Sequence, residues 1–356
     1  MNKNLLISTG GSGGHVVPAT IFYEHLKKNF EIIITTDKRG LQFLNKEKYN
    51  IEIINTPKLS KNLFLLPFQL FLILYLIFKS FFFLKKKKIK ILISTGGYMS
   101  LPLCIASKIL NIKIFLFEPN IVLGRANRFF LNFCEKIFCY SNKMNNFPNK
   151  LTNKIIIINT LLRKEFYLTK SNENINKVIN LLIIGGSQGA KLFDTVVKNS
   201  VIKLSKKYKL KIFQQTNFKN YKDLRKFYSD NSIESELFDY SDNIIEFMNQ
   251  THLCVTRAGA STLAELTFLN IPYLTIPYPL AKDDHQFQNA LFYKNMNCCW
   301  LLKQEDLKDD VLFNNLINII RNKEDYLIKK KNMKKFSYQN TWNNINQKLI
   351  SIINEN

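Results

Sequence analysis

The feature that most constrains the fold of this chain is an apolar run followed by glycines, which occurs three times. The three copies span residues 4–15, 90–98 and 180–189. Each copy starts with a continuous apolar strand, as a parallel sheet that is buried on both faces requires. The glycines that follow let the backbone come close to a ligand. The sequence therefore predicts an α/β protein with doubly wound parallel sheets.

The spacing of the three copies predicts two domains. The first two copies lie in one half of the 356-residue chain, and the third copy opens the other half. Each half has the size of an ordinary α/β domain. We expect an N-terminal domain at residues 1–160 and a C-terminal domain at residues 161–336. We expect residues 337–356 to form a helix that packs back on the first domain.

Residues 253–290 hold the densest group of candidate site residues. A buried strand at residues 253–256 runs into a glycine turn and then into a helix that contains Ser261, Thr262 and Glu265. A helix N-terminus after such a turn offers free N–H groups and the positive end of a dipole, which suits phosphate. A second strand leads to a polar cluster at residues 283–290. Polar groups at the carboxyl ends of parallel strands mark the ligand crevice of an open α/β sheet.

The net charge of +24 favours anionic partners, although a nucleotide bias that enriches the chain in Lys would also produce it. We do not expect nucleic acid as a partner, because the lysines are scattered and no RNA-binding signature is present. The six cysteines form no Cys-x-x-Cys pair, and the four histidines lack the spacing of metal ligands. Asp283 and Asp284 read as the start of a helix. We therefore expect no required metal and no cofactor.

Residues 63–84 form the most hydrophobic segment, and Lys85 to Lys88 follow it. Its longest run without a polar residue, residues 70–78, is far shorter than the ~20 residues of a bilayer span. Two interpretations remain open together: a crossover helix buried on one side, and a Lys-flanked helix that rests in the membrane interface. A transmembrane span is not expected, because it would separate the first glycine loop from the second.

Five motifs, in order along nearly the whole chain, resemble the MurG family of peptidoglycan N-acetylglucosaminyltransferases (glycosyltransferase family 28). One glycine loop alone would be weak support, but five ordered matches are strong. The matching segments are Gly10-Gly-Ser-Gly-Gly-His-Val-Val-Pro18, Thr95-Gly-Gly-Tyr-Met-Ser100, Glu118-Pro-Asn120 with Gly124-Arg-Ala-Asn-Arg128, Gly185-Gly-Ser-Gln-Gly-Ala190, and Arg257-Ala-Gly-Ala260 through Glu265 with Asp284-His-Gln286.

The resemblance implies the GT-B architecture, in which two Rossmann-like domains face each other across a cleft. It implies an inverting transfer of N-acetylglucosamine from UDP-GlcNAc to the 4-hydroxyl of N-acetylmuramic acid in lipid I, undecaprenyl-diphospho-MurNAc-pentapeptide. The products are lipid II and UDP. It also implies a peripheral enzyme on an anionic membrane surface, at the cytoplasmic face of the cell membrane. The first domain would face the membrane and the acceptor, and the second would bind UDP-GlcNAc.

The resemblance also implies roles for residues of the donor site. Glu265 would accept hydrogen bonds from the ribose hydroxyls. Ser261 and Thr262, which could at the same time cap their helix, would hold the diphosphate as it gains charge. Ser187 would add a hydroxyl and backbone donors, and Arg163 would approach the uridine end or help close the cleft. Sugar hydroxyls or the acetamido group would be bound by Gln286 and Asn120.

In the first domain the resemblance points to His15 as general base, because imidazole exchanges a proton near neutral pH. A structural histidine bonded to the loop backbone is the alternative. Backbone N–H groups of Ser12, Gly13 and Gly14 would bind donor or acceptor. The second loop, with Gly96, Gly97 and Tyr98, would take the acceptor diphosphate.

The sequence departs from the family pattern at three places. Pro119 stands in place of a usual Gln, Leu123 in place of a Pro, and residues 158–160 in place of Gly-Asn-Pro. A different UDP-sugar transferase of the same architecture is the main alternative. A dinucleotide oxidoreductase is disfavoured because residues 10–14 do not fit G-x-G-x-x-G. The donor-site cluster argues against a non-catalytic membrane-surface protein.

Overall fold

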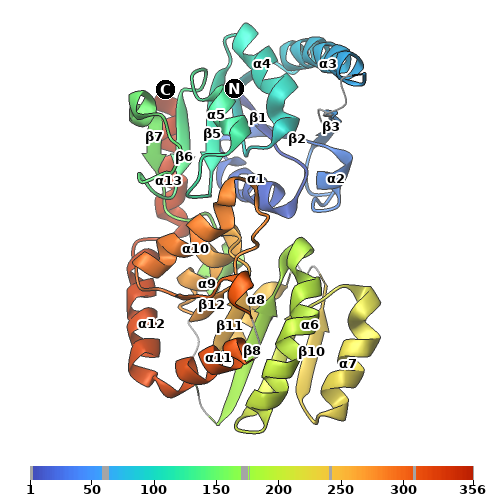
Figure 1. Ribbon diagram of the computed structural model, residues 1–356. Coiled ribbons are helices and arrows are strands. Elements are labelled where there is room, and N and C mark those ends of the chain that lie inside the picture. Colours follow the sequence, from blue (N-terminus) through green and yellow to red (C-terminus); the bar gives the residue numbers. More distant parts are fainter. Residues whose placement is uncertain are drawn as a thin grey trace. The chain divides into compact units, whose positions relative to one another are not determined.

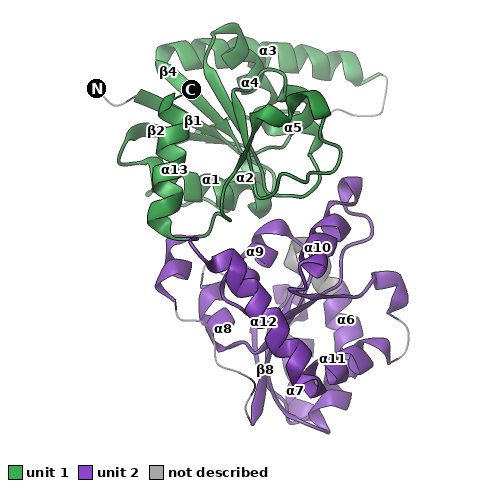
Figure 2. Ribbon diagram, turned by 90° about the vertical axis from the view of Figure 1, so that its left-hand side faces the viewer, with its two compact units in different colours: residues 1–162, 341–356 green, residues 163–340 purple. Residues whose placement is uncertain are grey.

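Two parallel sheets, one in each of two units, carry the fold of this computed structural model (Figure 2). The first unit consists of residues 1–162 and 341–356, and the second of residues 163–340. The structure describes residues 3–57, 64–169, 175, 177–239, 243–307 and 310–355, without the side chains of residues 186–191.

The first unit holds a seven-stranded parallel sheet in the order β3-β2-β1-β4-β5-β6-β7 (Figure 1). Its strands are β1 (Lys3–Ser8), β2 (Phe30–Thr36), β3 (Ile51–Ile53), β4 (Ile89–Ser94), β5 (Lys113–Glu118), β6 (Lys136–Cys139) and β7 (Ile155–Ile157). Its helices are α1 (Gly13–Leu26), α2 (Lys38–Leu41), α3 (Leu66–Lys86), α4 (Leu101–Ile109), α5 (Arg125–Phe130) and α13 (Trp342–Glu355).

The second unit holds a six-stranded parallel sheet in the order β10-β9-β8-β11-β12-β13. Its strands are β8 (Val178–Ile184), β9 (Lys209–Gln215), β10 (Glu234–Phe238), β11 (Leu253–Thr256), β12 (Tyr273–Thr275) and β13 (Trp300–Leu301). Its helices are α6 (Gly186–Ser205), α7 (Tyr221–Asp230), α8 (Ile244–Gln250), α9 (Ala260–Phe268), α10 (His285–Asn295), α11 (Val311–Arg321) and α12 (Lys323–Ser337).

Both sheets reverse their strand order at one place, and this reversal positions the candidate site residues. The reversal lies between β1 and β4 in the first unit and between β8 and β11 in the second. Ligands of open α/β sheets bind outside the carboxyl ends of the strands at such a switch point. The glycine loops that the sequence singled out leave β1, β4 and β8, and the turn of residues 257–259 leaves β11. The predicted doubly wound parallel-sheet class is confirmed.

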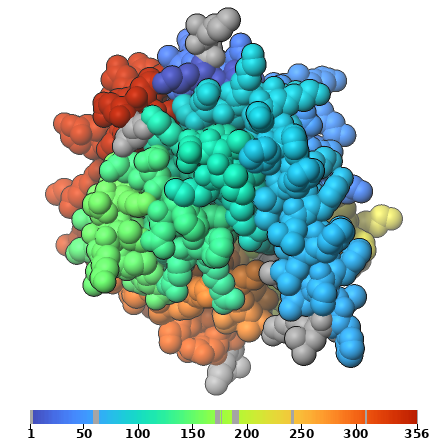
Figure 3. Space-filling model, turned by 90° about the horizontal axis from the view of Figure 1, so that it is seen from above, coloured from blue at the N-terminus to red at the C-terminus, as the bar shows by residue number. Residues whose placement is uncertain are grey.

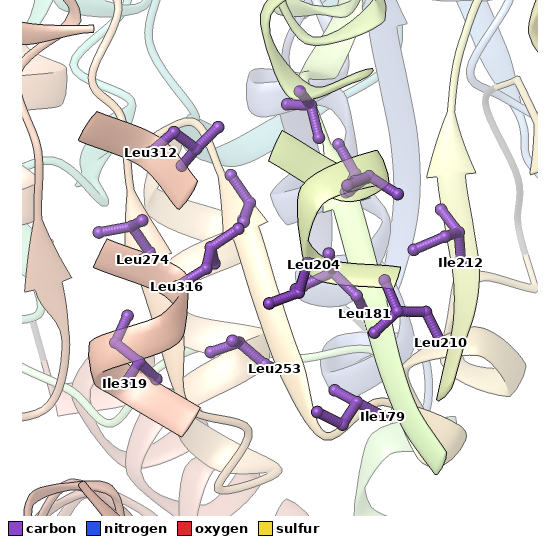
Figure 4. Packing of buried hydrophobic residues seen from close by; sticks show 14 of the residues in the cluster. Ile179, Leu181, Leu204, Leu210, Ile212, Leu253, Leu274, Leu312, Leu316 and Ile319 are labelled. Carbon is purple, nitrogen blue, oxygen red and sulfur yellow. The ribbon is translucent and has the colours of Figure 1, made fainter. Parts of the chain in front are cut away.

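One hydrophobic core of the second unit lies between its sheet and helices α6 and α11. Figure 4 shows Leu181 of β8 and Leu253 of β11 pointing towards Leu204 of α6 and Leu316 of α11. All four side chains are completely buried. Burying each such side chain stabilises the fold by roughly 1.5–3 kcal/mol, so the apolar strands fix the sheet against its helices.

The C-terminal helix α13 returns to the first unit and packs against α1. It begins at Trp342 rather than at residue 337, because α12 continues to Ser337. The Trp342 ring stacks on the buried His25 ring at a centroid distance of 3.6 Å. Burial lowers the pKa of His25 to about 4, so this ring stays neutral within the contact near neutral pH.

Helix α3 differs from an ordinary crossover helix because few of its apolar side chains are buried. Only Ile73, Ser80 and Leu84 are buried along its 21 residues. It packs against α4, and Figure 3 shows the light-blue side chains of α3 on the surface of the first unit. Among the described residues, α3 is the helix whose length and composition would let it cross a membrane.

Candidate functional site

His15 links the two glycine loops of the first unit. It lies in the first turn of α1, and its Nδ1 atom is 2.8 Å from the carbonyl oxygen of Thr95. Gly96 has φ 94°, in the left-handed region, and a Cβ atom there would lie 3.3 Å from His15 Cε1. The close packing of the ring on the second loop therefore depends on glycine.

The contact with Thr95 selects the tautomer of His15. A carbonyl oxygen only accepts, so Nδ1 must carry the proton and donate it. The Nε2 atom of neutral His15 is then an acceptor, which is the state that a general base requires. The ring is half-buried rather than enclosed, so a substrate hydroxyl can approach it.

The residues before His15 form the N-terminus of α1. Ser12 is the cap residue of this 14-residue helix, but its side chain makes no capping hydrogen bond. Ser12 and Gly14 are exposed, and Gly13 is half-buried. Since the first N–H groups of a helix lack partners within it, this end offers several donors to an anion.

Asn120 is held by a buried carboxylate. Glu118, at the end of β5, is 4% exposed, and its Oε1 atom accepts from Asn120 Nδ2 at 2.8 Å. Its Oε2 atom accepts from Gly124 N at 2.9 Å and from Asn127 Nδ2 at 3.0 Å. A Cβ atom on Gly124 would lie 2.8 Å from that oxygen, so only glycine fits there. The Asn120 amide is thus fixed at the carboxyl edge of the sheet, despite the neighbouring Pro119.

In the second unit, α9 presents its N-terminus at the end of β11. Gly259 is the cap residue, so neither Ser261 nor Thr262 caps this helix, and the expected capping role is wrong. Both residues belong to the first turn and are half-buried. Their backbone N–H groups and hydroxyls remain suited to a phosphate.

Glu265 lies one turn further along α9 and is 9% exposed. Burial raises its pKa to about 7, and the positive charge of Arg163 partly opposes this rise. Two residues that are far apart in sequence, Arg163 and Glu265, therefore interact electrostatically within the second unit. A buried carboxyl with such a pKa needs hydrogen-bond donors to become fully ionised at neutral pH.

Helix α10 supports both neighbouring loops. Gln286 Oε1 accepts from Tyr278 N at 2.9 Å, in the segment after β12. Asn289 Nδ2 donates to Ala258 O at 3.2 Å, in the turn after β11. Asp283 and Asp284 precede this helix with φ values of 52° and 54°. Gln286 is therefore fixed through its oxygen, and its amide nitrogen faces away from that bond.

Arg257, in the motif Arg257-Ala-Gly-Ala260, is a further candidate site residue for which no role was predicted from the sequence. It is 6% exposed and donates to Ile276 O, Pro277 O and Gln304 Oε1. Its guanidinium lies 5.2 Å from the Phe193 ring centroid and 5.5 Å from that of Tyr278. Burial lowers the pKa of Arg257 to about 10, so it stays charged at neutral pH. An arginine that ends a buried strand at a glycine turn is the signal that could have identified it.

Ser187, predicted for the donor site, has a side chain outside the described part of the chain. Helix α6 begins at Gly186, directly after β8. Within the described ranges, no group of three or more His, Cys, Asp or Glu side chains is arranged to hold a metal ion.

Comparisons with known proteins agree on one family. Residues 5–139 match the glycosyltransferase family 28 N-terminal domain, and residues 180–345 match the family 28 C-terminal domain. A relative from Pelagibacter ubique, named UDP-N-acetylglucosamine–N-acetylmuramyl-(pentapeptide) pyrophosphoryl-undecaprenol N-acetylglucosamine transferase, is 59% identical over 100% of both chains. A transferase of the same name from Rickettsia bellii is 32% identical and covers 90% of this chain and 91% of its own.

Solved structures agree on the fold. The crystal structure of Acinetobacter baumannii MurG has a TM-score of 0.78 at 22% identity and covers 99% of this chain and 100% of its own. The Neisseria meningitidis UDP-GlcNAc 2-epimerase bound to UDP-GlcNAc has a TM-score of 0.66 at 13% identity, with 99% and 100% covered. From the match of both domain models and the identity along its full length, this chain belongs to glycosyltransferase family 28.

Proposed function

We propose that this protein transfers N-acetylglucosamine from UDP-GlcNAc to the 4-hydroxyl of N-acetylmuramic acid in lipid I and so forms lipid II. The observation that carries this proposal is 59% identity along the whole chain to a transferase named for that reaction. The ordered motifs of both units support it, because they follow the carboxyl ends of strands, where ligands of open α/β sheets bind.

The proposed chemistry is one displacement with inversion. His15 Nε2 takes the proton of the acceptor 4-hydroxyl while the oxygen of that hydroxyl attacks the anomeric carbon of the donor sugar. The bond from that carbon to the diphosphate oxygen breaks, and UDP leaves with the electron pair. The 2.8 Å contact of His15 Nδ1 with Thr95 supports this role, because it keeps the lone pair on Nε2.

We assign the donor to the second unit. Glu265 accepts from the ribose hydroxyls, Ser261 and Thr262 bind the diphosphate with the first turn of α9, and Arg163 lies towards the uridine. Arg257 adds a buried positive charge. Within the described part of the chain its guanidinium donates to two carbonyl oxygens and one amide oxygen, with no carboxylate among these acceptors. A fixed positive charge in a low dielectric stabilises the negative charge that develops on the leaving group.

Ser187, Gln286 and Asn120 complete the proposed recognition of UDP-GlcNAc. Gln286 and Asn120 are amides whose orientation is fixed by Tyr278 N and Glu118, respectively. Pre-oriented amides suit the hydroxyl and acetamido groups of a sugar, because less entropy is lost on binding. Glycine-loop N–H groups at Ser12, Gly13 and Gly14, and at Gly96, Gly97 and Tyr98, are assigned to substrate diphosphate.

We further propose that α3 holds the protein on an anionic membrane at the cytoplasmic face, as a peripheral enzyme. Seven large apolar side chains of α3 are exposed: Phe68, Leu70, Phe71, Leu74, Tyr75, Phe78 and Phe82. Lys79, Lys85 and Lys86 are exposed on the same helix, which contains no acidic residue. An apolar surface with basic neighbours suits the interface of anionic lipid.

The test is a transfer assay with defined acceptors. Purified protein, radiolabelled UDP-GlcNAc and a short-chain lipid I analogue should give a labelled disaccharide product that mass spectrometry assigns as a β-1,4 linkage after digestion. A second reaction replaces the lipid I analogue with soluble sugar acceptors. Transfer to those acceptors with none to the lipid I analogue would identify the alternative, a different UDP-sugar transferase of the same fold.

A further inference from the structure

Asp37 is a buried carboxylate behind the first glycine loop. It follows β2 directly and is 4% exposed. Its Oδ1 atom accepts from Gly11 N at 2.8 Å and from Gly40 N at 2.9 Å. Burial raises the pKa of Asp37, but the hydrogen bonds from Gly11, Arg39 and Gly40 outweigh it and lower the pKa below the ordinary value. Asp37 is therefore ionised, and the first loop is built around its charge.

Arg39 extends from this carboxylate to the second glycine loop. Its Nε atom donates to Asp37 Oδ2 at 2.7 Å, and its Nη2 atom donates to the Tyr98 hydroxyl. The guanidinium carbon lies 5.4 Å from the centroid of the Tyr98 ring. The Nη2 atom is also 3.7 Å from where a Cβ atom of Gly11 would stand. The guanidinium thus lies beside both glycine loops.

The two charges of the Asp37–Arg39 ion pair differ in their exposure to solvent. Asp37 carries its negative charge inside the protein, with 6% of its side chain exposed, whereas 53% of the Arg39 side chain is exposed. The positive end of the pair therefore faces solvent next to the two loops. Within the described part of the chain, the Arg39 hydrogen bonds come from Nε and Nη2, and Nη1 makes none. A planar guanidinium with an outward N–H group suits a phosphate oxygen.

We propose that Arg39 binds the diphosphate of the acceptor and makes the enzyme select acceptors that carry two phosphates. This inference rests on the proposed function and deepens it, because it names the charged group of the acceptor subsite. Glycine-loop N–H groups supply neutral donors, and Arg39 supplies the formal charge that opposes the two negative charges of a diphosphate diester. The Arg39 side chain also connects the two glycine loops through Asp37 and Tyr98. The test must therefore separate diphosphate binding by Arg39 from its structural role in holding the loops.

The test compares two acceptors in three proteins. The acceptors are short-chain lipid I and an analogue in which a monophosphate replaces the diphosphate, each measured at saturating UDP-GlcNAc. The proteins are wild type, Arg39→Gln and the control Lys38→Gln, which removes the same charge from the adjacent exposed residue. For Arg39→Gln we expect kcat/KM with the diphosphate acceptor to fall about 10- to 100-fold, as for loss of one charge-assisted pair. We expect kcat/KM with the monophosphate acceptor to fall much less. The KM for UDP-GlcNAc should stay within about twofold of wild type.

Two results with Arg39→Gln would overturn the proposal. Equal losses with both acceptors would make Arg39 a brace of the loops only, and no loss would remove it from the subsite. If Arg39→Gln does not fold, as judged by circular dichroism and by the thermal shift that UDP produces, Arg39→Lys replaces it. Lysine keeps the charge without the fork, and we expect a partial loss of the preference for diphosphate; an unchanged preference would contradict the proposal. Wild-type protein that transfers to neither acceptor would instead refute the proposed function.

Discussion

The Nδ1 atom of His15 lies 2.8 Å from the carbonyl oxygen of Thr95, and this contact joins the first glycine loop to the second. Because the carbonyl can only accept, the contact orients the ring and leaves Nε2 without a proton in the neutral form. The same geometry would hold a purely structural histidine in place. Kinetics can separate the two roles.

We expect His15→Gln to lower kcat by about 10²- to 10⁴-fold, the usual contribution of a general base. Glutamine can still donate an amide N–H to Thr95 O, but it cannot take a proton from the acceptor. UDP-GlcNAc affinity, measured by calorimetry, should change little, because His15 is assigned to proton transfer from the acceptor and not to donor binding. Near-wild-type kcat in His15→Gln would show that the ring serves only to hold the loops.

Glu265 should make stability depend on pH. Burial raises its pKa in the folded protein to about 7 from an ordinary value of 4.5. Between these values the folded state holds a proton that the unfolded chain has lost, so the folded state binds more protons. The contribution to stability is complete below pH 4.5 and is lost as the pH rises through about 7.

Comparison with Glu265→Gln isolates this effect, because glutamine keeps the shape and never ionises. From pH 4.5 to 8, wild type should lose ~3 kcal/mol in its free energy of unfolding relative to the variant. Urea titrations across that range measure the difference. If the difference in free energy of unfolding between the two proteins stays constant across this pH range, the pKa of Glu265 is not raised.

The same carboxyl links pH to donor binding. Ribose hydroxyls donate to the ionised form, so UDP should lower the pKa of Glu265 and expel its proton. At pH 6.5, calorimetry in buffers with different ionisation enthalpies should therefore show more proton release for wild type than for Glu265→Gln. Taking the difference cancels the titration of UDP itself. Equal proton release in both proteins would place the ribose elsewhere.

Much of the fold was readable from the sequence because parallel strands buried on both faces are continuous apolar runs. Residues 253–256, read as a strand, are β11 without any shift of its ends. The glycine turns after these strands were readable because a backbone that must approach a ligand requires glycine. The predicted family is confirmed by the relatives and the domain models.

Side-chain partners over long sequence distances were not readable. Nothing near Asp37 in the sequence shows that its carboxylate accepts from Gly11 N, since the contact arises from pairing of β1 with β2. Arg257 carries no partner within its own motif, because its acceptors follow β12 and lie at Gln304. The exposure of α3 was only partly anticipated, as hydrophobicity alone does not tell a core helix from a surface helix. The roles assigned to single site residues stay predictions.

Helix α3 should control membrane binding. Replacing Phe71 and Phe78 by serine removes two side chains that are 66% and 62% exposed and should barely affect stability. Each aromatic ring that enters the interface contributes up to ~2–3 kcal/mol, so affinity for vesicles with anionic lipid should fall at least tenfold. Flotation or sedimentation with such vesicles measures the bound fraction.

The matched control for α3 is Leu327→Ser with Ile328→Ser, on α12 of the second unit, where the residues are 48% and 40% exposed. Loss of two exposed apolar groups there should leave vesicle binding unchanged. If the two double variants behave alike, α3 is not the membrane contact. Extraction of wild type by high salt or carbonate tests for a peripheral protein, and resistance to both would favour a span.

Asp194 holds the helix that follows the third glycine loop against the neighbouring strand. It lies on α6, is 5% exposed, and accepts from Gln214 Nε2 at 2.9 Å and from Thr216 Oγ1 at 2.8 Å. Asn220 Nδ2 donates to the same carboxylate at 2.7 Å, and the Tyr228 hydroxyl donates to Gln214 Oε1. The buried charge is thus satisfied by neutral donors that all lie beyond α6.

We expect Asp194→Leu to destabilise the protein by ~2–5 kcal/mol, because it strands several buried donors without an acceptor. It should also raise the KM for UDP-GlcNAc, since α6 begins at the third glycine loop. Asp194→Asn should retain most stability and activity: its oxygen can accept from Thr216 and Asn220, and the Gln214 amide can turn to accept from its nitrogen. Asp230→Leu, at an exposed site, is the control and should stay within about 0.5 kcal/mol of wild type. If Asn proves as damaging as Leu, then the negative charge itself, rather than the count of hydrogen bonds, holds α6 on β9.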